Sequence, residues 1–431
     1  MTPRRSFLKN LGISALSIPF LQQWNTVEAA ELETHFESFS LDQAENDEDF
    51  WYRIQQSYSV SPNIINLNNG GVSPQPKVVQ ETFENFNRLS NEGPSYYMWR
   101  ILDQGREPLR NSLAELAGCS ADELAINRNA TEALGTIIMG IPLEKGDEIV
   151  LSRWDYPNMI NAWKWREKRD GIKLVWVEHP HTSENADELT KRYTDAFTSK
   201  TKVVHITHLI NWNGQVIPVA KIAQKAREKG ILSISDSAHS FAHLDFKIPD
   251  LQVDFCGTSL HKWLCAPFGS GLLYVRKDKI ANLAPLFPGE KPESEDIRKF
   301  ETLGTRSFPT ELAIGRAIDF HNGIGSTRKF ERLHQLKTYW TEKVKTLPGV
   351  TVHTPASAQF SGAIGLFSIE GMKPSEIEPE LFKPYGIHTV GIDWNNISGV
   401  RVTPHVYTPF ADLDVLVKAI TTIAEKAQKK G

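Results

Sequence analysis

The chain has 431 residues, of which 40% are hydrophobic and 23% charged, and its formal net charge is −4 at pH 7. This length and apolar content predict a large globular domain with a smaller second domain. A slightly acidic chain without a long basic run excludes nucleic acid and an anionic membrane surface as expected partners, so we expect a small-molecule ligand.

The first thirty residues have the layout of an export signal. They contain, in order, an arginine pair, a short apolar run and two small residues: Arg4-Arg5, Leu11 to Leu21, and Ala29-Ala30. The pair resembles the twin-arginine signal, which exports folded bacterial proteins. The alternative is an amphipathic first helix of the mature fold, but the apolar run lacks helical periodicity. We expect residues 1–30 to be a signal peptide and the mature protein to be periplasmic, without a stable membrane anchor.

From residue 148 the chain repeats one pattern, in which a short β-rich apolar run is followed by polar residues and then by a helical stretch. The runs lie at 148–152, 173–178, 202–209, 231–235, 253–259 and 271–276. Their nearly continuous hydrophobicity is typical of strands that helices cover on both faces. Residues 220–230 read as an amphipathic crossover helix that ends at Gly230. The pattern predicts an α/β domain with a mostly parallel sheet.

After residue 276 the pattern changes to long helical stretches, followed by apolar runs at 351–355, 363–371 and 400–407 and by a final helix over 412–430. This change predicts a smaller α+β domain with its own sheet. We place the large domain at residues 76–280 and the small domain at 281–431. An N-terminal segment, residues 31–75, is expected to pack with the small domain.

Two chemically distinctive side chains follow two of the predicted strands. Asp236 comes directly after the run at 231–235, and Lys262 comes shortly after the run at 253–259. Because ligand-binding residues of an open parallel sheet gather at the carboxyl ends of its strands, both should face one ligand. A lysine amine can form a Schiff base with an aldehyde, and a carboxylate can keep a pyridine nitrogen protonated. Pyridoxal phosphate requires both groups, so the pair predicts a site for this cofactor. The alternative interpretation is that Asp236 and Lys262 form a structural ion pair.

Three motifs around these residues carry a family resemblance: DSAH at 236–239, SLHKWL at 259–264 and PFGSGLLYVR at 267–276. They resemble the class V aminotransferase family of fold-type I pyridoxal-phosphate enzymes, in particular its isopenicillin N epimerase-like branch. The likeness runs in the family's order from about Asn66 to Tyr407. It implies a mostly parallel seven-stranded sheet in the large domain and a homodimer. It also implies that Lys262 carries pyridoxal 5′-phosphate and that Asp236 faces the ring nitrogen.

The same resemblance assigns further residues to the cofactor. The segment NRNATEAL at 127–134 is similar to the family's phosphate loop, although an ordinary helix N-cap is the alternative there. The expected phosphate contacts are Ala130, Thr131, Ser259 and His261. The expected ring contacts are Tyr156 over the ring face, with Asn211 and His239 on the side of the ring hydroxyl.

Two more segments match parts of the family pattern outside the main sheet. Thr305 is expected to reach the phosphate of a neighbouring subunit, and Arg401 to bind the substrate α-carboxylate, for which a planar guanidinium is suited. A surface arginine on a strand is the alternative for Arg401. Asn69 and Gly70 are expected to bring backbone close to the substrate. No metal site is expected.

The sequence leaves the reaction open. The three cysteines are Cys119, Cys256 and Cys265, so no late cysteine is present to attack sulfur as in the desulfurase relatives. The expected substrate is an amino acid or small peptide, from which Lys262 removes the α-proton. Transamination, epimerisation and a lyase reaction without a catalytic cysteine then remain, as does a non-catalytic protein that only binds the cofactor.

Overall fold

The computed structural model describes residues 48–429, and the predicted signal peptide at 1–30 lies outside them. The chain divides into two units, Met1–Arg53 and Ile54–Gly431, and the first described helix, α3 (Glu48–Gln56), crosses their boundary. Both large sheets lie in the second unit. No helix between residues 48 and 429 is long and apolar enough to cross a membrane.

The large sheet has seven strands in the order β2-β8-β7-β6-β5-β3-β4. Strands β7, β6, β5, β3 and β4 are parallel to one another, whereas β8 runs antiparallel to both of its neighbours. This confirms the predicted mostly parallel sheet. The bounds are β2 (Leu124–Asn127), β3 (Glu148–Ser152), β4 (Lys173–Val177), β5 (Thr201–Thr207), β6 (Leu232–Asp236), β7 (Phe255–Ser259) and β8 (Gly271–Val275). The sequence pattern missed β2, whose four residues are too few to show a periodicity.

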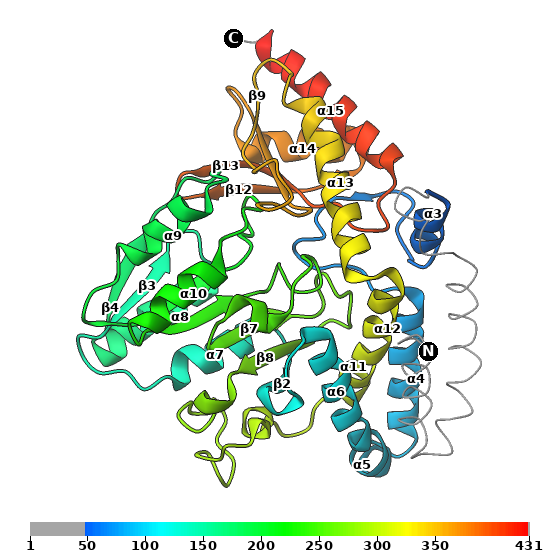
Figure 1. Cartoon of the computed structure of the whole chain (residues 1–431). Coiled ribbons are helices and arrows are strands. Elements are labelled where there is room, and N and C mark those ends of the chain that lie inside the picture. Colours follow the sequence, from blue (N-terminus) through cyan, green and yellow to red (C-terminus); the bar gives the residue numbers. More distant parts are fainter. Residues whose placement is uncertain (1–47, 430–431) are drawn as a thin grey trace, which may run out of the picture. The chain divides into compact units, whose positions relative to one another are not determined.

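Helices cover both faces of this sheet (Figure 1). One face packs in a single apolar cluster with α6 (Arg106–Ala117), α9 (Ala186–Thr194) and α10 (Val219–Glu228). The other packs with α7 (Ala130–Gly140) and α8 (Pro157–Asp170). Each helix presents an apolar stripe, such as Ile222, Ala223 and Ala226 of α10, to the strands. The sheet is therefore buried on both sides, and only its strand ends are open to a ligand.

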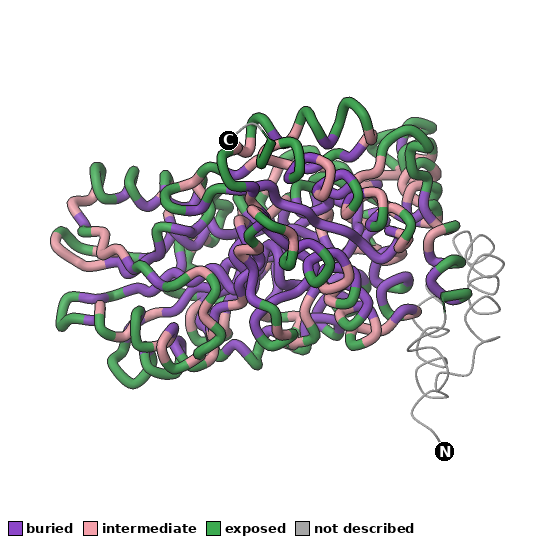
Figure 2. The backbone as a smooth tube through the Cα atoms, turned by 90° about the horizontal axis from the view of Figure 1, so that it is seen from above, coloured by how far each residue is buried: buried purple, intermediate pink, exposed green. Residues whose placement is uncertain are grey.

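The small domain has a second sheet, in the order β12-β13-β10-β9, with antiparallel pairing throughout. Its strands are β9 (Val350–Val352), β10 (Gly365–Ile369), β12 (Val390–Trp394) and β13 (Ile397–Val402). Three helices pack on this sheet, α13 (Ser326–Val344), α14 (Pro374–Tyr385) and α15 (Phe410–Gln428), and α13 and α15 lie side by side in Figure 1. Figure 2 shows the buried backbone passing through the interior, with exposed loops at the rim.

The remaining elements connect the two sheets. Strand β1 (Ile65–Asn66) pairs in parallel with β11 (Ile387–His388), which ties the segment before the large domain to the small domain. Helices α11 (Phe308–Leu312) and α12 (Ile314–Ile324) pack against α4 (Lys77–Glu92) and α6. The short elements are α5 (Pro94–Tyr96), η3 (Tyr97–Ile101), η4 (Leu102–Gly105), η5 (Ala121–Glu123), η6 (Ile248–Leu251), η7 (Lys277–Lys279) and η8 (Ile297–Glu301).

Candidate active site

Lys262 and Asp236 emerge at the same edge of the large sheet. Asp236 is the last residue of β6, and Lys262 lies three residues beyond Ser259, the last residue of β7. These strands are parallel neighbours, with Asp236 in register with Gly257. Asp236 is 4% exposed and Lys262 is half-buried, so both open on a sheltered space at the strand ends.

Burial sets the protonation of both groups. It lowers the pKa of Lys262 to about 8, with Asp236 opposing the shift and Arg401 adding to it. Burial also raises the pKa of Asp236. Two interactions oppose this shift: the backbone N–H of Ala238 donates to Asp236 Oδ1 over 3.0 Å, and Lys262 lies nearby. A lysine whose pKa lies near neutrality is available as a nucleophile and as a base.

His239 lies directly beside the lysine. Its Nε2 is 2.9 Å from Lys262 Nζ, and its Nδ1 accepts a hydrogen bond from Trp263 Nε1 over 3.4 Å. Burial, followed by the nearby charges of Lys262 and Arg401, lowers the pKa of His239 well below its ordinary value. The ring is therefore neutral near neutral pH and makes a hydrogen bond to Lys262.

The predicted phosphate loop forms the start of helix α7. Asn129 is its N-cap and accepts from the backbone of Glu132 over 2.9 Å, while Ser259 Oγ accepts from Ala130 N over 2.9 Å. Thr131 is exposed at the first turn. The N-cap interpretation and the phosphate interpretation are compatible, because a capped helix start still directs backbone N–H groups outward.

Strand β8 approaches this loop closely. A Cβ atom at Gly271 would lie 2.6 Å from Asn129 Cα and 2.8 Å from the carbonyl oxygen of Thr258. His261, also predicted at the phosphate, has its Nδ1 3.1 Å from the carbonyl oxygen of Ser270. The loop, β7 and β8 are thus packed together without room for a side chain between them.

Arg401 lies on β13 of the small domain and is 7% exposed. Its Nη1 donates to the carbonyl oxygen of Asn211 over 2.8 Å and its Nη2 to Asn68 Oδ1 over 3.1 Å, while Nε is buried without a partner. No Asp or Glu of residues 48–429 forms an ion pair with it, and burial lowers its pKa to about 10. A buried cation without a counter-charge is a suitable site for a ligand carboxylate.

The segment 68–70 lies against Arg401, and the expected approach of its backbone to the substrate stays a prediction. The side chain of Asn69 is held by protein groups, since it donates to the carbonyl oxygen of Thr403 over 2.8 Å and accepts from Tyr407 Oη over 2.6 Å. Gly70 leaves room at the guanidinium, because a Cβ there would lie 3.4 Å from Arg401 Cζ. Asn68, which the sequence reasoning missed, is the residue whose side chain contacts Arg401.

Tyr156 follows β3 and is the N-cap residue of helix α8, and it is 40% exposed. The loop before it is held by three indoles, Trp154, Trp212 and Trp394, which we call the tryptophan clasp. Trp212 and Trp394 stack at 5.2 Å, and each donates over 2.9 Å to a loop carbonyl, that of Trp154 and that of Arg153 respectively. Trp154 in turn donates to Asn396 Oδ1 over 3.1 Å. The clasp joins the Tyr156 loop, the loop after β5 and the hairpin that leads to Arg401.

Asp155 is a second buried carboxylate that the sequence reasoning missed. It accepts from Ser152 N over 2.8 Å and from Thr207 Oγ1 over 2.6 Å. Burial raises its pKa to about 7, and nearby Asp236 adds to the shift against these hydrogen bonds. Its place directly before Tyr156 was the only available signal in the sequence.

Thr305 is the residue expected to contact the phosphate of a neighbouring subunit. It is exposed in the segment between η8 and α11, and none of the described hydrogen bonds joins it to the strand-edge residues. Its predicted contact with a neighbouring subunit stays a prediction. Among residues 48–429, no group of three or more His, Cys, Asp or Glu side chains is placed to hold a metal ion.

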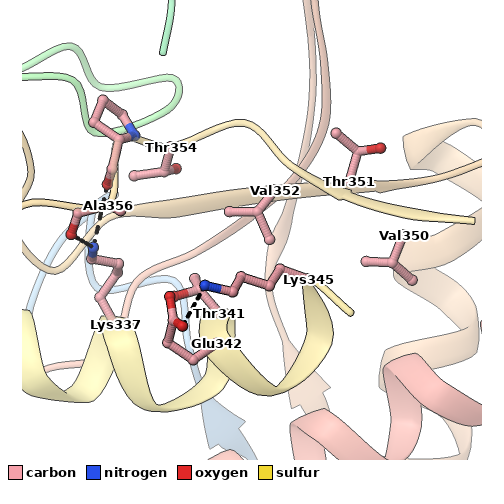
Figure 3. Close-up of a pocket in the computed structure, with 10 residues that line it drawn as sticks. Lys337, Thr341, Glu342, Lys345, Val350, Thr351, Val352, Thr354 and Ala356 are labelled. Carbon is pink, nitrogen blue, oxygen red and sulfur yellow. Dashed lines mark hydrogen bonds and ion pairs between the residues drawn. The ribbon is translucent and has the colours of Figure 1, made fainter. Parts of the chain in front are cut away.

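A pocket of about 310 Å³ lies elsewhere, between helix α13 and strand β9 of the small domain (Figure 3). Lys337 donates there to the carbonyl oxygens of Pro355 and Ala356 over 3.3 and 3.0 Å, and Lys345 pairs with Glu342. Both ammonium groups of this pocket already have partners. The reactive groups converge instead at the edge of the large sheet.

The residues at this edge fit pyridoxal phosphate. They offer an amine for its aldehyde, a buried carboxylate on the neighbouring strand for its ring nitrogen, an exposed aromatic ring and a helix start for its phosphate. Asn211 also carries a buried amide oxygen without a hydrogen-bond partner, and the two ends of an amide are interchangeable by a flip. Each of these groups therefore has a counterpart on the cofactor.

The chain is similar to known proteins in sequence and in fold. A sequence profile of the family described as aminotransferase class-V matches residues 65–391. Isopenicillin N epimerase of Streptomyces clavuligerus is 26% identical over 86% of this chain and 98% of its own. A probable cysteine desulfurase of Halalkalibacterium halodurans is 25% identical over 86% of this chain and 96% of its own. A solved structure of C-DES, a lysine-to-alanine mutant with glycine covalently linked to the PLP cofactor, superposes with a TM-score of 0.77 at 21% identity, covering 85% of this chain and 98% of that one.

Proposed function

Since the chain belongs to the aminotransferase class-V family, we infer that it acts on the α-carbon of an amino acid or small peptide. Its cofactor is pyridoxal 5′-phosphate, which supplies an aldehyde and a ring that withdraws electrons from the reacting carbon. The observation that carries the proposal is the placement of Lys262 at 2.9 Å from His239, beside buried Asp236, with buried Arg401 nearby.

Each of these residues has one proposed task. Lys262, with its pKa lowered to about 8, accepts the α-proton from its own face of the substrate. Asp236 holds the cofactor ring nitrogen through its buried carboxylate. Arg401 binds the substrate carboxylate, because its Nε lacks a protein partner and its charge lacks a counter-charge among residues 48–429. Tyr156 covers the cofactor ring, and the start of α7 with Ser259 holds the phosphate.

We favour epimerisation or transamination over desulfuration by a cysteine nucleophile. Cys265 is 1% exposed and Cys256 is fully buried, while Cys119 is half-buried on the loop after helix α6. Burial raises the pKa of Cys265, so its thiol is not ionised near neutral pH. Similarity to isopenicillin N epimerase over nearly its whole length supports reprotonation of the α-carbon.

The test is exchange of the substrate α-proton with solvent deuterium, followed by proton NMR. Purified protein with pyridoxal phosphate is incubated with single amino acids and small peptides in heavy water. Loss of the α-proton signal with inversion at the α-carbon indicates an epimerase, and loss with a keto acid indicates an aminotransferase. Release of ammonia with a cleaved side chain indicates a lyase. A Lys262→Ala protein is the control, and no exchange with any substrate would leave only cofactor binding.

We also propose a homodimer and export through the twin-arginine signal. The exposed position of Thr305 allows a contact from a neighbouring subunit, and the first thirty residues have the layout of a signal. Light scattering of the active protein tests the dimer, and a fully active monomer would refute it. Sequencing the N-terminus of protein recovered from the periplasm tests the export, and an intact Met1 would refute cleavage.

A further inference from the structure

We propose that Trp263 is a positioning residue: its indole N–H fixes His239 in the tautomer that carries the proton on Nε2, so that His239 donates to the Lys262 amine. Trp263 is the residue directly after the lysine and is fully buried. It touches neither the strand-end carboxylate nor the phosphate loop in the described hydrogen bonds, and it acts through His239.

The orientation of the indole is set by stacked imidazole rings. Trp263 stacks on His243 at 3.7 Å with 25° between the planes, and on His405 at 5.3 Å with 13°. The carbonyl oxygen of Trp263 accepts a hydrogen bond from buried Lys329. The indole ring and the backbone of Trp263 are thus both fixed, and the indole N–H points at His239 Nδ1.

His243 has only one possible neutral tautomer. Its Nε2 accepts the backbone N–H of Ala363 over 2.7 Å, so that nitrogen carries no proton. Its Nδ1, which lies 2.8 Å from the carbonyl oxygen of His239, must then donate to it. Burial lowers the pKa of His243 to about 3, which agrees with a neutral ring. His243 therefore anchors the backbone of His239 and supports the indole at the same time.

The tautomer of His239 follows from the indole. An indole N–H can only donate, so the Nδ1 that lies 3.4 Å from Trp263 Nε1 must accept. A neutral His239 then has its proton on Nε2, which lies 2.9 Å from Lys262 Nζ. Only a neutral amine has the lone pair to accept that proton in a hydrogen bond. The arrangement therefore favours the uncharged, nucleophilic form of the lysine.

The other charges around the pair act in both directions. Asp236 favours the ammonium form of Lys262, whereas Arg401 and burial oppose it. Lys262, Arg401 and His243 all oppose protonation of His239. His261, the residue before the lysine, is itself held neutral by burial and by Lys262. Three influences therefore favour the neutral amine of Lys262: the hydrogen bond from His239, burial and the charge of Arg401. Only the carboxylate of Asp236 favours the ammonium form.

The effect of this tautomer on catalysis rests on the proposed function of Lys262, whereas the tautomer itself does not. The tautomer and the protonation of the amine are properties of the full-length protein after removal of the cofactor. They can be measured without turnover, so failure of the tautomer and failure of the proposed reaction give different results.

The first measurement is made on the unaltered sequence. Nitrogen-15 NMR of histidine-labelled protein, with the His239 ring assigned by its absence from a His239→Gln variant, reports which ring nitrogen is protonated. We expect a neutral ring protonated on Nε2 near neutral pH. A ring protonated on Nδ1, or an imidazolium, would overturn the proposal. This result does not depend on whether any tryptophan variant folds.

The second measurement uses Trp263→Phe, which keeps an aromatic ring and removes the N–H. His239 can then move its proton to Nδ1 and accept from an ammonium group, so the pKa of Lys262 should rise by about one unit. Below that pKa, reaction of the lysine with trinitrobenzenesulfonate should slow about tenfold, as measured by mass spectrometry of the peptide that contains it.

Trp340→Phe is the matched control. Trp340 is also fully buried, but its indole N–H has no partner and it packs on Phe367 in the small domain. This variant reports the effect of the smaller ring alone, and its Lys262 should react as in the parent protein. A folded Trp263→Phe protein with an unchanged pH profile of Lys262 modification would overturn the proposal.

Discussion

Replacing Arg401 by methionine removes the buried guanidinium and keeps an unbranched side chain. Arg401 is 7% exposed, has an unpartnered Nε and has no acidic partner among residues 48–429, so a substrate carboxylate would receive its free donors. Hydrogen bonds to charged groups contribute about 1.5–3 kcal/mol each. Loss of two of them costs about 3–6 kcal/mol, which lowers kcat/KM about a hundredfold to ten-thousandfold.

The assay compares two substrates of the Arg401→Met protein: an amino acid that the parent protein converts, and the amine that lacks its carboxylate. We expect the loss in kcat/KM for the amino acid alone. The melting temperature should change little, because unpairing Asn211 O and Asn68 Oδ1 is offset by removing a buried charge. Arg169→Met, an exposed arginine at the end of α8, is the control. Equal losses for both substrates would refute the carboxylate assignment.

Three further changes test other parts of the site. Gly271→Ala should raise the dissociation constant of the cofactor at least about tenfold, because the new Cβ would lie 2.6 Å from Asn129 Cα; equilibrium titration measures it. Burial raises the pKa of Asp155 from 3.8 to about 7, so the folded protein retains a proton that the unfolded chain has released. The stability that this proton contributes is present at low pH and is lost as the pH rises from 4 to 7. Urea unfolding across this range should show the free energy of unfolding of the parent falling by up to a few kcal/mol relative to that of Asp155→Asn. Trp394→Leu should raise KM about tenfold in steady-state assays, because it removes the stacking on Trp212 and an indole hydrogen bond of the clasp.

Each of these changes has a control in the same chain. Gly135→Ala, in helix α7 with no atom within 4 Å of the new Cβ, should raise stability by up to about 1 kcal/mol and leave cofactor affinity unchanged. Equal affinities for the two alanine variants would contradict the packing argument. A constant stability difference between Asp155→Asn and the parent across this pH range would show that the carboxylate is ionised throughout. Trp165→Leu, an exposed tryptophan on α8, should leave KM unchanged, and the same result for Trp394→Leu would exclude the clasp from substrate binding.

The sheet was predictable from sequence where the pattern was long enough. Strands β3 to β8 lie within about two residues of their predicted runs, because strands buried on both faces need nearly continuous apolar residues. Strands β1, β2, β11 and β12 were missed, and β1 and β11 have only two residues each. Strand β2 has only four residues, and β12 has the sequence VGIDW, in which a glycine and an aspartate interrupt the apolar run.

The site divides in the same way. The placement of Lys262, Asp236 and His239 together follows from strand ends that parallel pairing brings to one edge. The contact between Asn68 and Arg401 joins residues 333 positions apart, and no local pattern predicts such a pair. The role expected for Thr305 depends on a second subunit.

The sequence by itself therefore determined the alternation of strands and helices and the chemistry at the strand ends, since both depend on residue types at short spacing. Only the tertiary structure decided which groups surround that chemistry. The donor from Trp263 to His239, the buried Asp155 near Asp236 and the tryptophan clasp all depend on side-chain direction and packing between distant segments. Such contacts follow from how the elements fit together in three dimensions, which local residue patterns do not encode.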